Sequence, residues 1–320
     1  MQSSLGLIPK KKPVTLITGF LGAGKTTLLK RILTENHGQK IAVIVNEFGE
    51  VGIDDKLIVE ESADMVKLTN GCICCTMKNE TATTLINMLD GKNDFERVVI
   101  ETTGLANPLP ILKNFLSEQF IKEHYTLDAV IAVVDAKNVK EQLDTNIETK
   151  EQIAYADLIL LNKLDLVSQE EAEQIKVWLK AINQSAKIIE TERSNAPIED
   201  IFDLQRKEKD YSAPSSHSHI EDAQINSFVL ETDKPISKAK LQSWLSELVL
   251  LHSADLLRYK GIFYVKDHPE RFVLQGVHTV FELTEDRLWR DGEEQKTQVV
   301  FIGRSLDKEL FEAGFRELTS

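Results

Sequence analysis

The chain has 320 residues, which is long for one domain and enough for two, each with its own core. Its formal net charge of -13 argues against nucleic acid or an anionic membrane as the main partner, because both need a basic surface. No apolar run is long enough to cross a bilayer, and the charges of residues 1–12 follow a short apolar patch, the reverse of a signal peptide. The sequence therefore predicts a cytoplasmic protein.

The first two thirds of the chain alternate apolar runs with helical patterns. This order is typical of a parallel sheet covered by helices. Strands are predicted at 14–18, 41–46, 65–68, 98–101, 129–134, 158–162 and 187–190. Helices are predicted at 26–35, 78–89, 108–117 and 170–182. Polar residues follow several of these strands, at the edge where open α/β sheets bind ligands.

The last third has a different rhythm. Strands near 226–231, 261–265, 272–283 and 298–302 are predicted, with a helix after the first and another at the end. The first helix carries an apolar stripe, formed by Leu241, Trp244, Leu245, Leu248 and Val249. This mixed order indicates a small α+β domain. We therefore expect a flexible N-terminus (1–12), an α/β domain (13–205), a linker (206–224) and a smaller α+β C-terminal domain (225–320).

A phosphate-binding loop follows the first predicted strand. Residues 19–26 fit the pattern G-x-x-x-x-G-K-[ST] and lie between an apolar run and an amphipathic segment, as the motif requires. Its glycines allow the backbone to turn successive N–H groups toward an anion. Lys25 would reach the β- and γ-phosphates, and the Thr26 hydroxyl would bind Mg²⁺. The predicted nucleotide contacts are Gly19, Gly22, Ala23, Gly24, Lys25, Thr26 and Thr27. The first domain is thus predicted to be a P-loop NTPase domain.

A second nucleotide motif, Asn162-Lys163-Leu164-Asp165, ends a later apolar strand. The carboxylate of Asp165 can accept hydrogen bonds from both N1–H and the exocyclic amine of guanine. Adenine offers no N1–H, so ATP would leave a buried acceptor unpaired. Asn162 would steady the loop and the base, and the stem of Lys163 would cover the purine face. Together with the P-loop, this motif predicts GTP as the nucleotide.

Two other strand ends carry acidic residues. Glu101 ends an apolar strand and Gly104 follows it, which suits a carboxylate that positions Mg²⁺ or water and an N–H that approaches the γ-phosphate. Residues 46–50, Asn-Glu-Phe-Gly-Glu, form an acidic loop that a bound γ-phosphate and Mg²⁺ would order. The alternative for this loop is a solvated acidic turn. Lys25, Glu101 and Glu47 are the candidate catalytic residues, and either carboxylate could orient the water.

All three cysteines lie within four residues, at Cys72, Cys74 and Cys75. This arrangement is unsuited to structural disulfides and can place two or three thiolates on one soft cation such as Zn²⁺. Without a fourth cysteine, the site favours exchangeable metal, with Glu47 or Glu50 as candidate fourth ligands. The competing interpretations of this cluster are a redox-active thiol pair and buried, unreactive cysteines. In the linker, His217 and His219 would either capture metal loosely or be solvated.

These motifs together resemble the CobW-like P-loop GTPases, the metallochaperone relatives of the urease and hydrogenase nickel-insertion GTPases. The motifs are 19–26, 46–50, 71–75, 101–104 and 162–165, in that order, and the C-x-C-C element is the most specific of them. Residues 257–261 and 275–277 are similar to the family's C-terminal module. The resemblance implies slow GTP hydrolysis, binding of Zn²⁺ or a similar ion at the cysteines, and its delivery to a client protein.

The sequence thus predicts a cytoplasmic GTPase that acts as a metallochaperone and couples metal delivery to GTP binding and hydrolysis. Its expected cofactors are GTP or GDP, Mg²⁺ and Zn²⁺ or another divalent transition metal. Its expected partner is a client metalloprotein, and no binding to nucleic acid or to a membrane is expected. A homo-oligomer is possible. Two alternatives are a P-loop kinase that acts on a small molecule and a regulatory GTPase whose cysteines sense redox state. The client, the physiological metal and the oligomeric state do not follow from the sequence.

Overall fold

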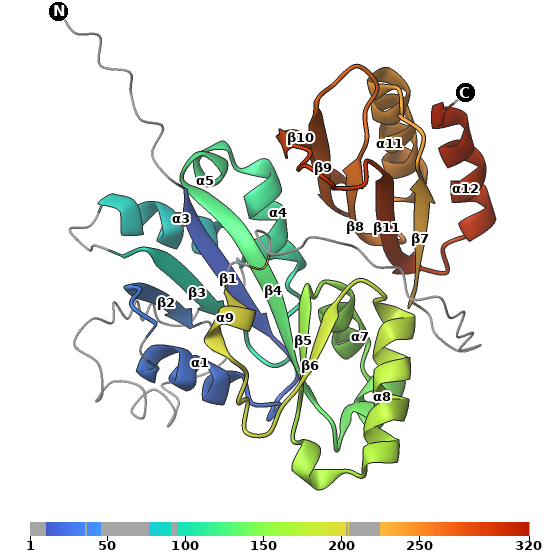
Figure 1. Ribbon diagram of the computed structural model, residues 1–320. Helices are drawn as coiled ribbons and strands as arrows, with labels where there is room; N and C mark the ends of the chain where they lie inside the picture. Colours follow the sequence, from blue (N-terminus) through green and yellow to red (C-terminus); the bar gives the residue numbers. More distant parts are fainter. Residues whose placement is uncertain are drawn as a thin grey trace, which may run out of the picture.

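The computed structural model describes residues 11–35, 37–45, 77–90, 95–202, 204 and 225–319. Within this range the chain forms an N-terminal part built on one sheet and a C-terminal part built on another (Figure 1). The predicted strand 65–68, the predicted loop 46–50, the cysteine turn and the linker 206–224 lie outside the described residues. None of the described helices has the length and apolar character needed to cross a membrane.

Six parallel strands form the N-terminal sheet, in the order β2-β3-β1-β4-β5-β6. Their bounds are β1 (Lys12–Thr18), β2 (Ile41–Val45), β3 (Arg97–Glu101), β4 (Tyr125–Asp135), β5 (Leu158–Asn162) and β6 (Lys187–Glu190). The order reverses at β1, since β2 and β3 lie on one side of it and β4 to β6 on the other. Open α/β sheets bind ligands at such a switch point, beyond the carboxyl ends of the strands.

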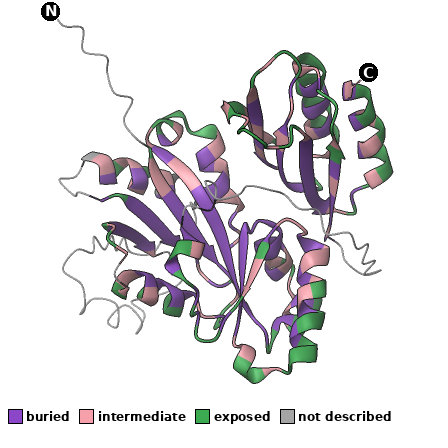
Figure 2. Cartoon of the chain, in the orientation of Figure 1, coloured by how far each residue is buried: buried purple, intermediate pink, exposed green. Residues whose placement is uncertain are grey.

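Helices cover both faces of this sheet because the strand residues that point to each face are apolar. Leu16 and Ile100 point into a core with most of the helices, whereas Ile17 and Val99 point into a second core with α1 and α9. The helices are α1 (Lys25–Thr34), α3 (Met77–Asp90), α4 (Leu109–Ser117), α5 (Gln119–His124), α6 (Val139–Thr145), α7 (Ile147–Ala154), α8 (Gln169–Ile182) and α9 (Ile198–Ile201). Strands β1 to β5 are accordingly buried along most of their length, whereas the edge strand β6 is exposed or half-buried (Figure 2).

Five antiparallel strands form the C-terminal sheet, in the order β10-β9-β8-β11-β7. The strands are β7 (Ile225–Thr232), β8 (Leu256–Phe263), β9 (Glu270–Val277), β10 (Val280–Leu288) and β11 (Thr297–Arg304). Two helices, α11 (Lys238–His252) and α12 (Lys308–Arg316), cover one face, and their core includes Trp244, Phe301 and Phe311. Leu241, Trp244, Leu245 and Leu248 of the predicted stripe are buried.

The strand predicted at 261–265 was misplaced, because β8 already begins at Leu256 and ends at Phe263. The predicted strand 272–283 is a hairpin of β9 and β10, which turns at His278, a residue with a φ of 48°. Both errors arise because Leu256 and Leu257 are apolar, as are Val277 and Val280 on either side of the turn, so periodicity alone does not show where the strand starts or bends. Four short helices, α5, α6, α7 and α9, were also missed, being four to eight residues long.

The second face of the C-terminal sheet packs against the N-terminal part. Leu257, Val277 and Val300 belong to the same buried cluster as residues of β4, α4 and α7. At the centre lies Asp157, which accepts hydrogen bonds from Arg258 Nη2 at 2.6 Å, from Lys260 Nζ and from the Val130 N–H at 2.7 Å. Both cations are about 95% buried. Burial alone would raise the pKa of Asp157, but Arg258 and Lys260 hold it below its ordinary value.

Asp157 therefore controls the stability of the contact between the two parts. We expect Asp157→Asn to lower the free energy of unfolding by about 3–5 kcal/mol, because two buried cations lose their counter-charge. Lys260→Met is the matched control: it leaves one cation with one carboxylate, so its cost should be much smaller. Chemical denaturation at pH 7, where Asp157 is ionised and its contribution is complete, measures both. Equal losses for the two variants would contradict this account of the charge balance.

Candidate functional site

The P-loop has the backbone conformation that its glycines predict. Gly19, Gly22 and Gly24 have φ values of 137°, 72° and 115°, a region that side chains rarely allow. A Cβ on Gly19 would lie 2.2 Å from the Val133 carbonyl oxygen of β4. Helix α1 begins at Lys25, directly after Gly24, so the free N–H groups of its first turn face the loop. The loop and helix together form an anion-binding site.

Lys25 and Thr26 follow at the start of α1. Lys25 is buried, and its Nζ donates to the Phe20 carbonyl at 3.1 Å, across the loop. Burial lowers the pKa of Lys25, and Glu101 partly offsets that effect. The Thr26 Oγ1 donates to Glu101 Oε1 at 2.9 Å. The structure thus brings Thr26, Lys25 and Glu101 together, as expected for a phosphate site with a metal ion.

The residues after β3 lie against the P-loop. Thr102 N–H donates to the Ile17 carbonyl at 3.0 Å, and the Thr102 and Thr18 hydroxyls are hydrogen-bonded at 3.1 Å. A Cβ on Gly104 would lie 2.7 Å from the Leu21 nitrogen. Gly104 is thus in close contact with the P-loop backbone. The absence of a side chain at 104 permits this approach.

Asn162 connects the P-loop to the end of β6. Its Nδ2 donates to the Ala23 carbonyl at 2.8 Å, and its Oδ1 accepts from the Ser194 N–H at 2.8 Å. The Ser194 Oγ donates to the Gly24 carbonyl at 3.0 Å. Sequence reasoning did not single out Ser194. The available signal was the polar run after the last predicted strand of the sheet, the same signal that marked the other strand ends.

The proposed base-binding residues lie beside Asn162. Lys163 has a φ of 64°, and its Nζ donates to Asp135 Oδ2 at 2.7 Å, which holds its stem in place. Asp165 lies in the short 3₁₀ helix Leu164–Leu166 and is exposed. Asp135 ends β4 and was not predicted, although an acidic residue after an apolar strand was the available signal. The structure therefore brings 19–27, 101–104 and 162–165 to one edge of the sheet.

The residues predicted to bind the transition metal lie elsewhere in the chain. Glu47, Glu50, Cys72, Cys74, Cys75, His217 and His219 are outside the described residues. Within the described part, no three His, Cys, Asp or Glu side chains are grouped closely enough to hold a metal ion. What the structure does place is the strand that precedes this segment: Val45, the last residue of β2, lies opposite Glu101 in the parallel pairing with β3.

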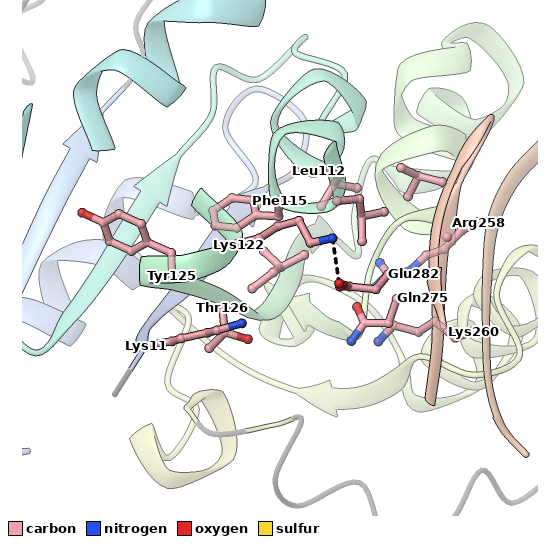
Figure 3. A pocket seen from close by; sticks show the side chains of 14 residues that line it. Lys11, Leu112, Phe115, Lys122, Tyr125, Thr126, Arg258, Lys260, Gln275 and Glu282 are labelled. Carbon is pink, nitrogen blue, oxygen red and sulfur yellow. Dashed lines mark ion pairs between the residues drawn. The ribbon is translucent and has the colours of Figure 1, made fainter. Parts of the chain in front are cut away.

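A cavity of about 80 Å³ lies between the two parts of the chain (Figure 3). Leu112 and Phe115 of α4 line one wall, and Lys260, Gln275 and Glu282 of the C-terminal sheet line the other. Lys122 reaches across it to Glu282, with the two charged atoms 2.8 Å apart. None of the predicted nucleotide-binding residues lines this cavity. It is a feature of the contact between the parts and not the nucleotide site.

The geometry of the site defines a P-loop nucleotide-binding protein. Two family descriptions match the chain: CobW/HypB/UreG, nucleotide-binding domain, over residues 13–190, and cobalamin synthesis protein cobW C-terminal domain, over residues 225–319. The chain therefore belongs to the CobW family of P-loop proteins, and it is a GTPase. The resemblance drawn from the motifs is confirmed, as is the α/β fold with a separate C-terminal domain.

Several relatives match along nearly the whole chain. The zinc chaperone YjiA of Escherichia coli K12 is 42% identical over 315 residues, which cover 95% of this chain and 98% of the relative. The zinc chaperone CobW of Pseudomonas aeruginosa is 34% identical, with 93% and 89% covered. The crystal structure of Zn(II)-bound YjiA GTPase from E. coli superposes with a TM-score of 0.76 at 38% identity, covering 97% of this chain and 100% of that one.

The hydrogen bonds of Asn162 give a direct test of the site. Asn162→Asp keeps the bond accepted from the Ser194 N–H but cannot donate to the Ala23 carbonyl, and it places a carboxylate beside that oxygen. We expect a loss of about 1–3 kcal/mol in the free energy of unfolding. GTP and GDP should both bind more weakly and by similar factors, because the change destabilises the whole P-loop and does not remove a contact to one particular phosphate. Isothermal titration with both nucleotides measures this, and unchanged affinities would contradict the role of Asn162.

Proposed function

We propose that this GTPase is a metallochaperone that binds Zn²⁺ or a similar transition metal at Cys72, Cys74 and Cys75 and delivers it to a client protein, and that metal binding is coupled to GTP binding and hydrolysis. The observation that carries the proposal is the pairing of Val45 with Glu101. Glu101 contacts Thr26 in the phosphate site, and the segment that contains all three cysteines begins directly after β2. The cysteine segment thus starts from the sheet edge that carries Glu101.

The part of the proposal that concerns the nucleotide is supported by residues that the structure describes. The loop N–H groups and Lys25 would bind the phosphates and offset the charge that develops during hydrolysis. Thr26 Oγ1 and Glu101 Oε1 are hard oxygen donors 2.9 Å apart, a pair that suits Mg²⁺. When bound, that ion would neutralise phosphate charge. This contact supports a place for Glu101 beside the ion, which leaves Glu47 as the candidate that orients the water.

The part of the proposal that concerns the transition metal is supported by the chemistry of the cysteines and by the relatives. Thiolates suit Zn²⁺ and other soft cations, and three of them leave one position for Glu47, Glu50 or an incoming ligand. The relatives named zinc chaperones match nearly the whole chain. A protein of Dictyostelium discoideum named zinc-regulated GTPase metalloprotein activator 1, 31% identical over 82% of this chain, supports a client protein as partner. We expect the exchange to occur in the cytoplasm.

Two alternatives make different predictions. A P-loop kinase would transfer phosphate to a small molecule, so release of phosphate from GTP with no acceptor present counts against it. A redox-sensing GTPase would keep its cellular role without metal transfer. The zinc chaperones among the relatives favour metal delivery over both.

The base specificity is testable at Asp165. In Asp165→Asn the side chain offers one donor and one acceptor, which match the C2 carbonyl and N1–H of xanthine instead of guanine. We expect GTP affinity to fall on the order of a hundredfold and XTP to bind better than GTP, because the hydrogen bond to the exocyclic amine of guanine is replaced by a donor–donor contact and the bond to N1–H loses its charge. Competition binding with a fluorescent nucleotide measures both values. Unchanged GTP affinity would show that Asp165 does not read the base.

The metal-binding role is testable with Cys74→Ser and Cys75→Ser. Each variant should bind Zn²⁺ at least tenfold more weakly, since serine is a poor ligand for this ion, while GTP affinity stays within about twofold. Competition with a chromogenic chelator measures Zn²⁺ affinity, and transfer to an apo acceptor protein measures delivery. Retained transfer in both variants would contradict the proposal, and retained activity and client rescue without transfer would favour the redox-sensing alternative.

A further inference from the structure

Helix α7 holds the loop between β3 and α4 in place through side-chain hydrogen bonds. This loop, residues 102–108, includes Gly104, which lies against the P-loop at Leu21. On α7, Gln152 is 1% exposed, and its Nε2 donates to the Gly104 carbonyl at 3.1 Å and to the Ala106 carbonyl at 3.2 Å. One buried amide group therefore fixes two carbonyls of the turn that we assign to the γ-phosphate.

The neighbouring residue on α7 joins the same loop to the C-terminal domain. Glu151 Oε2 accepts from Asn107 Nδ2 at 2.5 Å, and Glu151 Oε1 accepts from Arg304 Nη2. Asn107 in turn lies two residues before α4, and its Oδ1 accepts from the N–H of Leu109, the first residue of that helix, at 2.8 Å. The two oxygens of one carboxylate are thus divided between the loop and the last residue of β11.

The surroundings of Glu151 make this link sensitive to Arg304. The carboxylate is 92% buried, and burial raises its pKa while Arg304 counteracts that rise. Loss of Arg304 would leave a buried carboxylate with Asn107 as its remaining described partner, which favours a change in its position. Arg304 itself is anchored to its own domain, because its Nη1 donates to the Ala254 carbonyl at 3.2 Å.

The contact between the domains is not equally firm along its length. It is tight at Asp157, Arg258 and Lys260, whereas beside α4 it contains the cavity lined by Leu112 and Phe115 (Figure 3). Helices α4 and α7 both contact the C-terminal sheet. Interiors are close-packed elsewhere, so unfilled space beside α4 is where the loop and its helix can shift at low cost.

We propose that Gln152 is a positioning residue for GTP hydrolysis and that Arg304 of the C-terminal domain adjusts it through Glu151. The C-terminal domain then sets the position of Gly104 and with it the rate of hydrolysis. A client or metal that moves the C-terminal domain would change that rate by the same route. The inference rests on the proposed placement of the γ-phosphate at Gly104 and not on the delivery of metal.

The experiment compares GTP hydrolysis by the full chain in four variants, one of which is a control. Gln152→Leu, of similar size, removes both hydrogen bonds, and we expect kcat to fall about tenfold with KM for GTP and GDP affinity within about twofold. Arg304→Gln should lower kcat about three- to tenfold, and Arg304→Lys should recover most of the rate. Arg316→Gln is the matched control, because Arg316 is 78% exposed on α12 and pairs with Glu312 of the same helix.

A double variant tests whether Arg304 acts through α7. If it does, Gln152→Leu with Arg304→Gln should be no slower than Gln152→Leu alone, because the two changes act on one element. Multiplicative losses in the double variant, or wild-type kcat in Arg304→Gln, would overturn the inference. So would equal weakening of GTP and GDP with kcat unchanged, which is the result of a purely structural role. Absence of GTP hydrolysis in the wild type would instead overturn the site assignment itself.

Discussion

The hydrogen bond from Thr26 to Glu101 is the contact on which the rest of the site depends. It joins the first turn of α1 to the end of β3, and so connects the phosphate-binding loop to the strand beside it. Glu101 has two further neighbours: Val45 lies opposite it on β2, and the loop 102–108 follows it in the chain. One buried carboxylate thus adjoins the first turn of α1, the end of β2 and the loop that leads to α4.

The two domains are joined by contacts of different character. Asp157 with its two buried cations is a fixed ionic contact, costly to break once formed. The pair of Glu151 and Arg304 is partly exposed, and it bears directly on the loop after Glu101. A firm contact at one place and an adjustable one at another allow the C-terminal domain to remain attached while it acts on the nucleotide site.

Local sequence patterns predicted much of the fold and of the nucleotide site. Residues 19–26, Glu101, Gly104 and 162–165 are local motifs, each tied to the end of an apolar strand, so spacing alone placed them at one edge. The sequence could not show Ser194, Asp135 and Gln152 in the same way. Ser194 reaches Gly24 across 170 positions, and Gln152 reaches Gly104 across 48, so their roles depend on tertiary packing. The short helices were missed for a related reason, since packing stabilises them more than their own periodicity does.

The central claim is that the nucleotide and the metal influence each other at Glu101 and the adjoining β2. Its most direct test is the dissociation constant for Zn²⁺, measured with the full chain bound to a non-hydrolysable GTP analogue and bound to GDP. Coupling between sites requires the two constants to differ, and typical coupling corresponds to about 5- to 150-fold. The account predicts a difference in that range. Equal constants in the two nucleotide states would contradict it, even if hydrolysis of GTP proceeds normally.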